Sequence, residues 1–540
     1  MIDLRPEFLL PFLLYAETHY KFKGIYSRLI KNEPEIIADA PFRVEPGQPI
    51  PVLLLVKDAH RFPIQILEVT IEIRNENQVH WKRIFPFNLM LNENRFWFRL
   101  FHIDALKDIF GFVDVDVHIS IKINGQTRTY RNDNYRISSH RPLKVYFAKD
   151  PLPRFENWYF GDFHYHSNYT EDQVEFGAPL EATVAMARAI GLNFFAVTDH
   201  SYDLDDDEDS WIKNDHGIPK WHQLWGEVEN LNNSFSDFVI LPGEEVSAGN
   251  TNNRNVHLLI LNSRKFFPGK GDSAERWFQT QPDLSIEQVL NQLEDGALAM
   301  AGHPEMPTPF LQWLLIRRGR WEWQDFQHHR LNGFQIWNGE YDHSFHQGSS
   351  NWVKLLLERK RLSLIAGNDA HGNFNRFRQI GFPFFTFREN YSQLFGKMRT
   401  GVRITKDFNQ QNLIQAVKNC YALVSNGPIV DLLIRNEQNK TVQVGDEIQG
   451  HQFNLTIRVK SSEEFGKLES FHLVRGDLIT KREDSILVVE NFINRYSFEL
   501  EQKLTEFSNS VYIRAELTAR KANDQITRCL INPIWIKKTI

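Results

Sequence analysis

Alternating apolar and polar residues mark the first quarter of the chain, from about residue 40 to residue 148. The run "VDVDVHISIKI", residues 113–123, alternates strictly, and turn-type segments such as "EPGQP" separate it from other strand-like runs. Strict alternation is typical of antiparallel sheets with one face toward water. We therefore predict an N-terminal β-sandwich domain over residues 1–150, which ends near the proline-containing segment "DPLPRFEN".

From residue 151 to about residue 425, apolar strands alternate with amphipathic helices. One helical face follows Pro179 and consists of Leu180, Val184, Ala187 and Ile190. Ser285 and Gln288 have the spacing of a capping box at the start of a second helix. The order strand, helix, strand predicts a parallel α/β architecture in this region.

After residue 425 the pattern returns to strands, with runs such as "VDLLIRNE", "FNLTIRVKS" and "SVYIRAELTAR". These runs predict a second β-sandwich domain over residues 426–540.

Histidines and carboxylates stand at the ends of the apolar strands in the middle region. In chain order the candidates are His164, His166, Glu171 or Asp172, His200, Glu245 or Glu244, His257, His303, Asp369 and His371. Parallel barrels keep their active sites at the carboxyl ends of the strands, so we expect these side chains to meet there. His257 precedes its apolar run, which indicates that this strand runs the other way or that a loop supplies the histidine.

The mixture of imidazole and carboxylate ligands favours zinc, manganese or iron over calcium or magnesium. His164 and His166 are two residues apart, which places both on one side of a strand. Nine candidate ligands exceed the needs of one ion, so we predict two or three divalent transition metals. Asp162 and Asp199 neighbour these histidines and either orient imidazoles or make ordinary strand-end hydrogen bonds.

The order of these motifs resembles that of the PHP superfamily, the polymerase and histidinol phosphatase domains. The similar segments are "FHYHSNYTED", "GLNFFAVTDHS", "LPGEEVS", "NVHLLIL", "AGHPE" and "GNDAHG", within residues 158 to about 380. The flanking β regions resemble the carbaryl-hydrolase-like branch more weakly. This resemblance implies a distorted seven-stranded (β/α) barrel, PHP-like, flanked by the two β-sandwich domains.

The resemblance also implies three groups of ligands. His164, His166, Glu245 and Asp369 would hold one ion; Glu245 with His257 and His303 a second; Asp172, His200 and His371 a third. The sequence Thr170-Glu171-Asp172-Gln173 replaces the commoner Ser-Asp-Gly, so Glu171 stays an alternative to Asp172. Asp369, His371, His200 and Glu245 are assigned to catalysis, in which a metal-bridging hydroxide attacks the substrate.

The function predicted from this resemblance is a metal-dependent hydrolase that acts on a small phosphoester. A carboxylester or carbamate hydrolase on the same site is the alternative within the same class. A binding or assembly module without catalysis is the alternative of another class, and the intact set of ligands argues against it.

Composition narrows the partners of the chain. With 62 basic and 68 acidic residues, the net charge of −6 does not favour nucleic acid or an anionic membrane as the main partner. The two cysteines, Cys420 and Cys529, exclude a disulfide framework.

The apolar run "FLLPFLLYA" near the start has no basic residues ahead of it in the pattern of a signal peptide, so we predict a cytoplasmic protein. The oligomeric state is left open.

Overall fold

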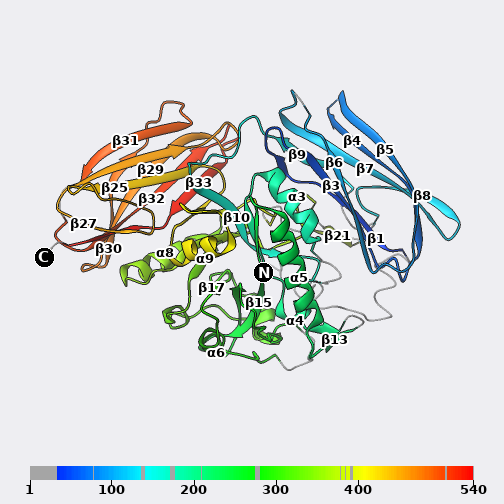
Figure 1. Cartoon of the computed structure of the whole chain (residues 1–540), viewed down its shortest axis with the longest axis horizontal. Coiled ribbons are helices and arrows are strands. Elements are labelled where there is room, and N and C mark those ends of the chain that lie inside the picture. The colour runs from blue at the N-terminus through cyan, green and yellow to red at the C-terminus, as the bar shows by residue number, and fades with distance from the viewer. Residues whose placement is uncertain are drawn as a thin grey trace, which may run out of the picture.

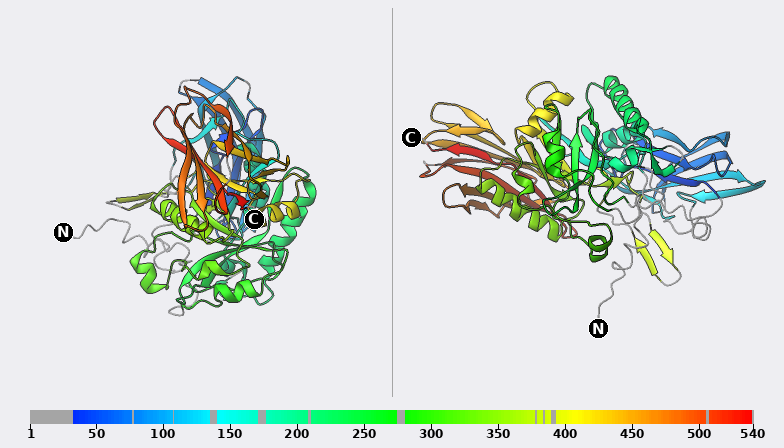
Figure 2. Two further views of the ribbon diagram at one scale, coloured as in Figure 1. Left: turned by 90° about the vertical axis from the view of Figure 1, so that its left-hand side faces the viewer. Right: turned by 90° about the horizontal axis from the view of Figure 1, so that it is seen from below.

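The computed structural model describes residues 33–538, apart from residues 77, 107, 135–139, 171–176, 208–209, 274–279, 377–378, 383–384, 389–392 and 505–506. The apolar run near the start of the chain lies outside the described residues. Strands from the N-terminal part lie at one end of the molecule and strands from the C-terminal part at the other, with most helices between them (Figures 1 and 2). Among the described helices, none is long and apolar enough to cross a membrane.

Two sheets form the N-terminal part. One contains β1 (Glu35–Asp39), β3 (Ile50–Lys57) and β6 (Phe96–Ile103). The other has the order β2 (Arg43–Val44), β9 (Leu143–Phe147), β7 (Gly111–Ile123), β4 (Ile64–Asn75) and β5 (Gln78–Leu91), and β8 (Gln126–Arg131) pairs with β7. The apolar residues of the alternating run in β7 are buried in a core shared by both sheets, as the alternation predicts.

The middle part begins with three parallel strands, β10 (Trp158–His166), β11 (Phe194–Val197) and β14 (Val239–Leu241). The connections contain α3 (Leu180–Ile190), α4 (Ser201–Leu204), the pair β12 (Asp206–Asp207) and β13 (Ser210–Asn214), and α5 (Pro219–Ser234). The predicted helical face after Pro179 is confirmed, because all four of its apolar residues are buried in α3. Gly191 ends this helix in the left-handed conformation.

A second sheet follows with the order β15 (Gly243–Gly249), β16 (Asn255–Leu261), β17 (Leu298–Ala301), β18 (Gly333–Asn338) and β19 (Ser363–Gly367). Its connections contain α6 (Ile286–Asn291), α7 (Phe310–Leu315), the 3-10 helix η2 (Asp325–Gln327) and α8 (His343–Leu357). The capping box predicted from Ser285 and Gln288 is confirmed at the start of α6. β16 is antiparallel to both neighbours, so the strand that carries His257 does run the other way.

The predicted (β/α) barrel is wrong. Apart from the two-stranded pairs β12–β13 and β21–β22, the described strands of the middle part lie in two separate hydrogen-bonded sheets, and the second sheet mixes antiparallel and parallel pairs. The structure as a whole, with its two flanking β parts, is 45% strand and 15% helix. The apolar core between the sheets includes Phe163, Leu259 and Ile365. The sequence pattern therefore predicted the order of strands and helices along the chain, but not how the strands pair into sheets.

The first sheet of the middle part continues into the C-terminal part. β10 pairs with β23 (Arg399–Arg403), and the order then runs through β24 (Ala422–Ser425), β33 (Ile526–Ile531), β32 (Val511–Arg520), β29 (Lys467–Asp477) and β30 (Arg482–Val489). The short strand β34 (Ile534–Lys537) pairs with β32, and β27 (Glu447–Gln449) pairs with β34. Helix α9 (Gln410–Lys418) links β23 to β24. The sheet thus crosses residue 425 without interruption.

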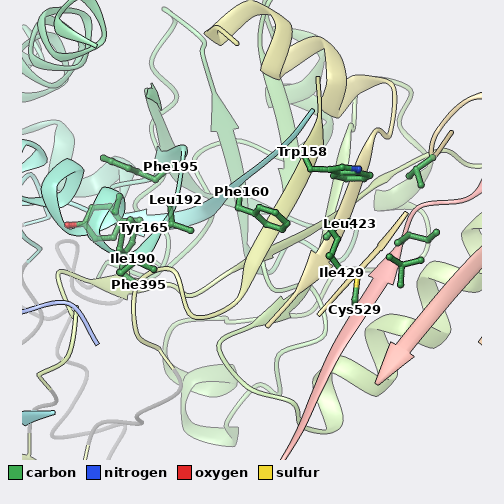
Figure 3. Packing of buried hydrophobic residues seen from close by; sticks show 14 of the residues in the cluster. Trp158, Phe160, Tyr165, Ile190, Leu192, Phe195, Phe395, Leu423, Ile429 and Cys529 are labelled. Carbon is green, nitrogen blue, oxygen red and sulfur yellow. The ribbon is translucent and has the colours of Figure 1, made fainter. Parts of the chain in front are cut away.

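A four-stranded sheet packs beside it, with the order β26 (Thr441–Gln443), β25 (Ile429–Asn436), β28 (Phe453–Lys460) and β31 (Ser497–Leu504). The short strand β20 (Ala370–His371) pairs with β10, and β21 (Gln379–Phe382) and β22 (Phe385–Arg388) form a hairpin. One apolar core joins these regions, and Figure 3 shows Phe160 of β10 and Leu423 of β24 within it. This shared core fixes the strand that carries His164 and His166.

Candidate metal centre

Eight of the nine predicted ligands are described, and they come together at one edge of the two middle sheets. His164 and His166 end β10, His200 follows β11, and Glu245 lies in β15. The remaining four are His257 in β16, His303 after β17, Asp369 after β19 and His371 in β20. All seven of these histidine and glutamate side chains are buried, and Asp369 is the most open of the eight, with 16% of its side chain exposed.

Glu245 stands at the centre of the cluster, with five histidines around its carboxylate. Oε1 lies 2.5 Å from Nδ1 of His257, 3.2 Å from Nε2 of His303 and 3.3 Å from Nε2 of His164. Oε2 lies 3.1 Å from Nδ1 of His200 and 3.4 Å from Nε2 of His166. The neighbouring Glu244, the alternative from sequence, points elsewhere and accepts hydrogen bonds from the Ser201 hydroxyl and the Phe267 backbone.

Asp369 closes the cluster from the opposite side. Its Oδ1 lies 3.1 Å from Nε2 of His166 and 3.3 Å from Nε2 of His164. Its backbone has a φ of 53°, and its N–H donates to the carbonyl of His164 at 2.9 Å. His303 also has a positive φ, of 23°. Non-glycine residues in this region cost conformational energy, and such strain concentrates at functional sites.

Three groups of ligand atoms are compact enough to hold an ion: His164, His166, Glu245 and Asp369; Glu245, His257 and His303; and His166, His200 and His371. The first two have the composition expected from sequence. In the third, His166 stands with His200 and His371, whose rings lie against it; the rings of His166 and His371 stack at 4.1 Å. Glu171 and Asp172 lie outside the described residues, so the choice between them stays a prediction.

Gln335 in β18 orients two members of the cluster and was missed by the sequence interpretation. Its Oε1 lies 3.0 Å from Nδ1 of His164 and accepts the backbone N–H of His303 at 2.9 Å. The His164 Nδ1–H therefore donates to Gln335, which turns Nε2 toward the cluster. Gln335 also donates to Asn338, whose amide donates to Asp369 at 3.3 Å. A glutamine inside an apolar strand is the signal that could have marked it.

Two further acceptors fix imidazoles in the same way. Oδ2 of Asp272 lies 3.3 Å from Nε2 of His257, which leaves Nδ1 facing Glu245. The carbonyl of Asp369 lies 3.2 Å from Nδ1 of His371. Asp272 is fully buried and forms an ion pair with Arg318. Neither Asp272 nor Arg318 follows an apolar strand, so nothing in the sequence pattern pointed to them.

Asp162 and Asp199 bind backbone and hydroxyl groups rather than imidazoles. Asp162 accepts the backbone N–H groups of His164 and Gly396 and the side-chain amide of Asn368. Asp199 accepts from the hydroxyl groups of Ser167 and Thr170, and burial raises the pKa of each aspartate to about 6. Of the two roles open from sequence, the ordinary strand-end hydrogen bond is the one observed.

The histidines of the cluster differ in their pKa values, so not all of them are protonated near neutral pH. Burial lowers the pKa of His164, but Asp369 and Glu245 outweigh it and raise the pKa to about 9. Burial and His200 lower the pKa of His166 to about 4, and burial with His166 holds the pKa of His371 well below its usual value. His166 and His371 are therefore neutral near pH 7, with lone pairs directed at other acceptors.

The spacing of the ligand atoms fits a metal ion better than hydrogen bonds. Nε2 of His164 and Nε2 of His166 are 3.2 Å apart. Two ligands at about 2.0–2.1 Å from a tetrahedral zinc ion are separated by about 3.3 Å, and those of an octahedral ion by about 2.9 Å. Within the described residues, Oε2 of Glu245 is buried and accepts no hydrogen bond. A buried carboxylate oxygen without a hydrogen bond, surrounded by imidazole nitrogens, is what a bound cation would satisfy.

A pocket of about 170 Å³ opens beside the cluster. Its lining includes His303, Gln335 and Asn338 together with the acidic residues Glu305, Glu340 and Asp342. The described lining includes no lysine or arginine, which phosphate-binding sites generally use. A larger groove of about 630 Å³, lined by residues such as Trp225 and Gln410, contains none of the cluster ligands.

Comparison with known proteins gives distant matches to solved structures only. A scan against protein families and a search of curated proteins find no match. A glycosyl hydrolase family 2 member from Bacteroides cellulosilyticus is 8% identical with a TM-score of 0.18, over 94% of this chain and 63% of that one. A β-glucuronidase from Parabacteroides merdae is 8% identical with a TM-score of 0.18, over 94% and 66%. A β-glucuronidase from Bacteroides uniformis is 8% identical with a TM-score of 0.19, over 93% and 61%.

These neighbours are hydrolases, and the chain spans less than two thirds of their length. TM-scores this low do not carry their fold or their substrates to this chain.

The fold corrects the predicted family. The resemblance to the PHP superfamily, including its carbaryl-hydrolase-like branch, implies a (β/α) barrel, which the described strands of the middle part do not form, so the predicted membership is wrong. Neither a family model nor a curated protein matches the chain. The predicted phosphoesterase activity and phosphoester substrate are wrong with it, since both rested on that resemblance. The acidic lining of the pocket gives a physical reason in the same direction, because carboxylates repel a phosphate anion.

Proposed function

We propose that this chain is a metal-dependent hydrolase with two or three divalent transition metals in the cluster around Glu245. The observation that carries the proposal is the arrangement of five imidazole nitrogens within 3.4 Å of the two oxygens of this one buried carboxylate. Each oxygen faces a different set of histidines, which suits a carboxylate that bridges two ions. Zinc, manganese and iron are the ions that such mixed ligands favour.

The residues divide among the ions by proximity. His164, His166 and Asp369 would share one ion with Glu245, and His257 and His303 a second. His200 and His371, together with His166, would hold a third. When bound, such ions acidify water and polarise the bond under attack, so that neither a serine nor a cysteine nucleophile is needed.

The chain's own residues prepare this chemistry by fixing protons and orientation. Gln335 holds the His164 ring with Nε2 toward Glu245, and Asp272 lies against Nε2 of His257, so that Nδ1 of His257 faces Glu245. Asn338 donates to Oδ2 of Asp369 and leaves Oδ1 toward His164 and His166. The near-complete burial of these groups excludes bulk water and strengthens every charge interaction among them.

Substrate reaches the cluster from the pocket beside His303. His303, a member of the cluster, lines this pocket. The wall of Glu305, Glu340 and Asp342 favours a neutral or cationic polar group over an anion.

The proposal is tested by hydrolysis assays on metal-loaded and chelated protein. We would use 4-nitrophenyl acetate, 4-nitrophenyl phosphate and 4-nitrophenyl glycosides, with the wild type, His166→Ala and the exposed His60→Ala as matched control. We expect turnover that chelation abolishes, that added zinc, manganese or iron restores, and that only His166→Ala removes. Glycoside cleavage that survives chelation and His166→Ala would contradict the proposal.

A further inference from the structure

A second charged site lies where strands of the N-terminal and C-terminal parts meet, and it contains none of the cluster ligands. Arg399 begins β23, Arg43 lies in β2, and Lys521 follows β32. All three cations surround the ring of Phe465: Cζ of Arg399 lies 5.1 Å, Nζ of Lys521 5.7 Å and Cζ of Arg43 6.0 Å from the ring centre. Phe465 itself is buried.

The three cationic side chains differ in their hydrogen-bond and carboxylate partners. Arg43 donates to both carboxylate oxygens of Glu464, to Glu45 and to the carbonyl of Ile190. Arg399 is only 2% exposed, yet among the described residues its guanidinium donates no hydrogen bond. The ammonium group of Lys521, which is partly buried, likewise has no carboxylate partner in the described part of the chain.

Local charge is not balanced around Arg399. Arg43, Arg154 and Arg399 face Glu45 and Glu464, and Lys521 adds a further positive charge. Burial and the proximity of Arg43 lower the pKa of Arg399 to about 10, which still leaves it charged near neutral pH. A nearly buried guanidinium without a hydrogen-bonded carboxylate is costly, because buried charges are normally paired.

We propose that Arg399 and Lys521 bind a small oxyanion beside Phe465, at the junction of β2, β23 and the loop after β32. A tetrahedral oxyanion such as sulfate or phosphate accepts several charge-assisted hydrogen bonds and would neutralise the excess positive charge. Because the site joins strands that are distant in the sequence, its occupation stabilises the junction between the two ends of the molecule. Ligands bound only by the folded state raise the unfolding temperature.

The test is thermal unfolding of the full-length protein in sodium sulfate and in sodium chloride of equal ionic strength. We expect a saturable rise in melting temperature with sulfate and not with chloride. Arg399→Gln is expected to weaken sulfate binding about tenfold or more, since it removes a charge-assisted contact. The wild type and the variants have the same metal cluster. Sulfate that binds to the cluster therefore cancels when their shifts in melting temperature are compared.

Two further variants make the result decisive. Lys521→Gln, at a partly buried position, tests the same site if Arg399→Gln fails to fold. Arg361→Gln is the matched control, because Arg361 also lies over a ring, 4.6 Å from the centre of Trp535, but is 44% exposed and paired with Glu447. Equal sulfate shifts in the wild type and in the Arg399 and Lys521 variants would overturn the proposal, as would equal shifts with chloride.

Discussion

Nδ1 of His164 lies 3.0 Å from Oε1 of Gln335, and this contact decides which ring nitrogen of His164 faces Glu245 and Asp369. The same oxygen accepts the backbone N–H of His303. One glutamine therefore positions residues on two sides of the cluster, through strands β10 and β18 that are far apart in the sequence.

Replacement of this glutamine should loosen metal binding without removing a ligand. We expect Gln335→Leu to weaken metal affinity by about 10- to 100-fold, the usual effect of losing a group that orients a metal ligand. The measurement is titration of chelated protein with zinc in competition with a metal-binding dye. Gln347→Leu, on α8 with a single weak side-chain contact, is the control. Equal affinities in the two variants would contradict the orienting role.

The Asp272–Arg318 ion pair should affect both stability and the second group of ligands. Asp272→Asn removes the buried countercharge of Arg318 and replaces the carboxylate beside Nε2 of His257 by a weaker, neutral amide. Breaking a buried ion pair typically costs about 3–5 kcal/mol in the free energy of unfolding. We expect urea unfolding to show a loss of this order, together with a lower metal content. Unchanged stability and unchanged metal content in Asp272→Asn would contradict both proposed effects of the Asp272–Arg318 pair.

Gly367 ends β19 directly against the backbone of His164. A Cβ atom at residue 367 would lie 2.5 Å from Cβ and 2.9 Å from N of His164. Gly367→Ala should therefore displace His164, with a cost of about 1–3 kcal/mol in unfolding free energy and loss of metal. At Gly348 in α8 the nearest atoms lie at 3.5 Å, so Gly348→Ala should be neutral or stabilising by up to about 1 kcal/mol. Both variants are compared by thermal unfolding and by metal analysis. If Gly367→Ala kept its metal, the predicted displacement of His164 would be contradicted.

Asp39 in β1 should make stability fall as the pH rises. It accepts the backbone N–H groups of Phe374 and Arg376, and burial raises its pKa from 3.8 to about 6. Between these values the folded state binds more protons than the unfolded state, so this group lowers the free energy of unfolding with increasing pH. The expected change between about pH 4 and pH 7 is about 3 kcal/mol, from a shift of roughly two pKa units.

Asp39→Asn isolates this contribution, because the amide does not titrate. We expect the stability advantage of the wild type over Asp39→Asn to shrink as the pH rises from 4 to 7, as measured by urea unfolding at each pH. A difference that is independent of pH would contradict the raised pKa of Asp39.

The sequence located the residues of the cluster better than it located the fold. Alternation in β7, the apolar face of α3 and the capping box of α6 are local patterns, and each is found where it was predicted. The barrel failed because strand pairing between segments distant in the sequence has no local pattern: the placing of His257 indicated that β16 could run the other way, but nothing indicated that β10 and β19 lie in different sheets. The family failed because short histidine motifs match by residue type alone.

The site shows the same division. His164, His166, Glu245 and Asp369 follow or end apolar strands, which the sequence reveals. Gln335 and Asp272 act only through spatial contacts with His164 and His257, and no spacing along the chain encodes these contacts.

Adjacent glutamates allow the most direct test of the central claim. Glu245 faces five histidines, whereas Glu244 is equally buried but bonds to Ser201 and Phe267. The measurement is elemental analysis of protein purified without chelator, for the wild type, Glu245→Gln and Glu244→Gln. We predict two or three transition-metal ions per chain in the wild type and in Glu244→Gln, and a loss of at least one ion in Glu245→Gln. Background metal in all three proteins, not increased by added zinc, manganese or iron, would contradict the metal centre.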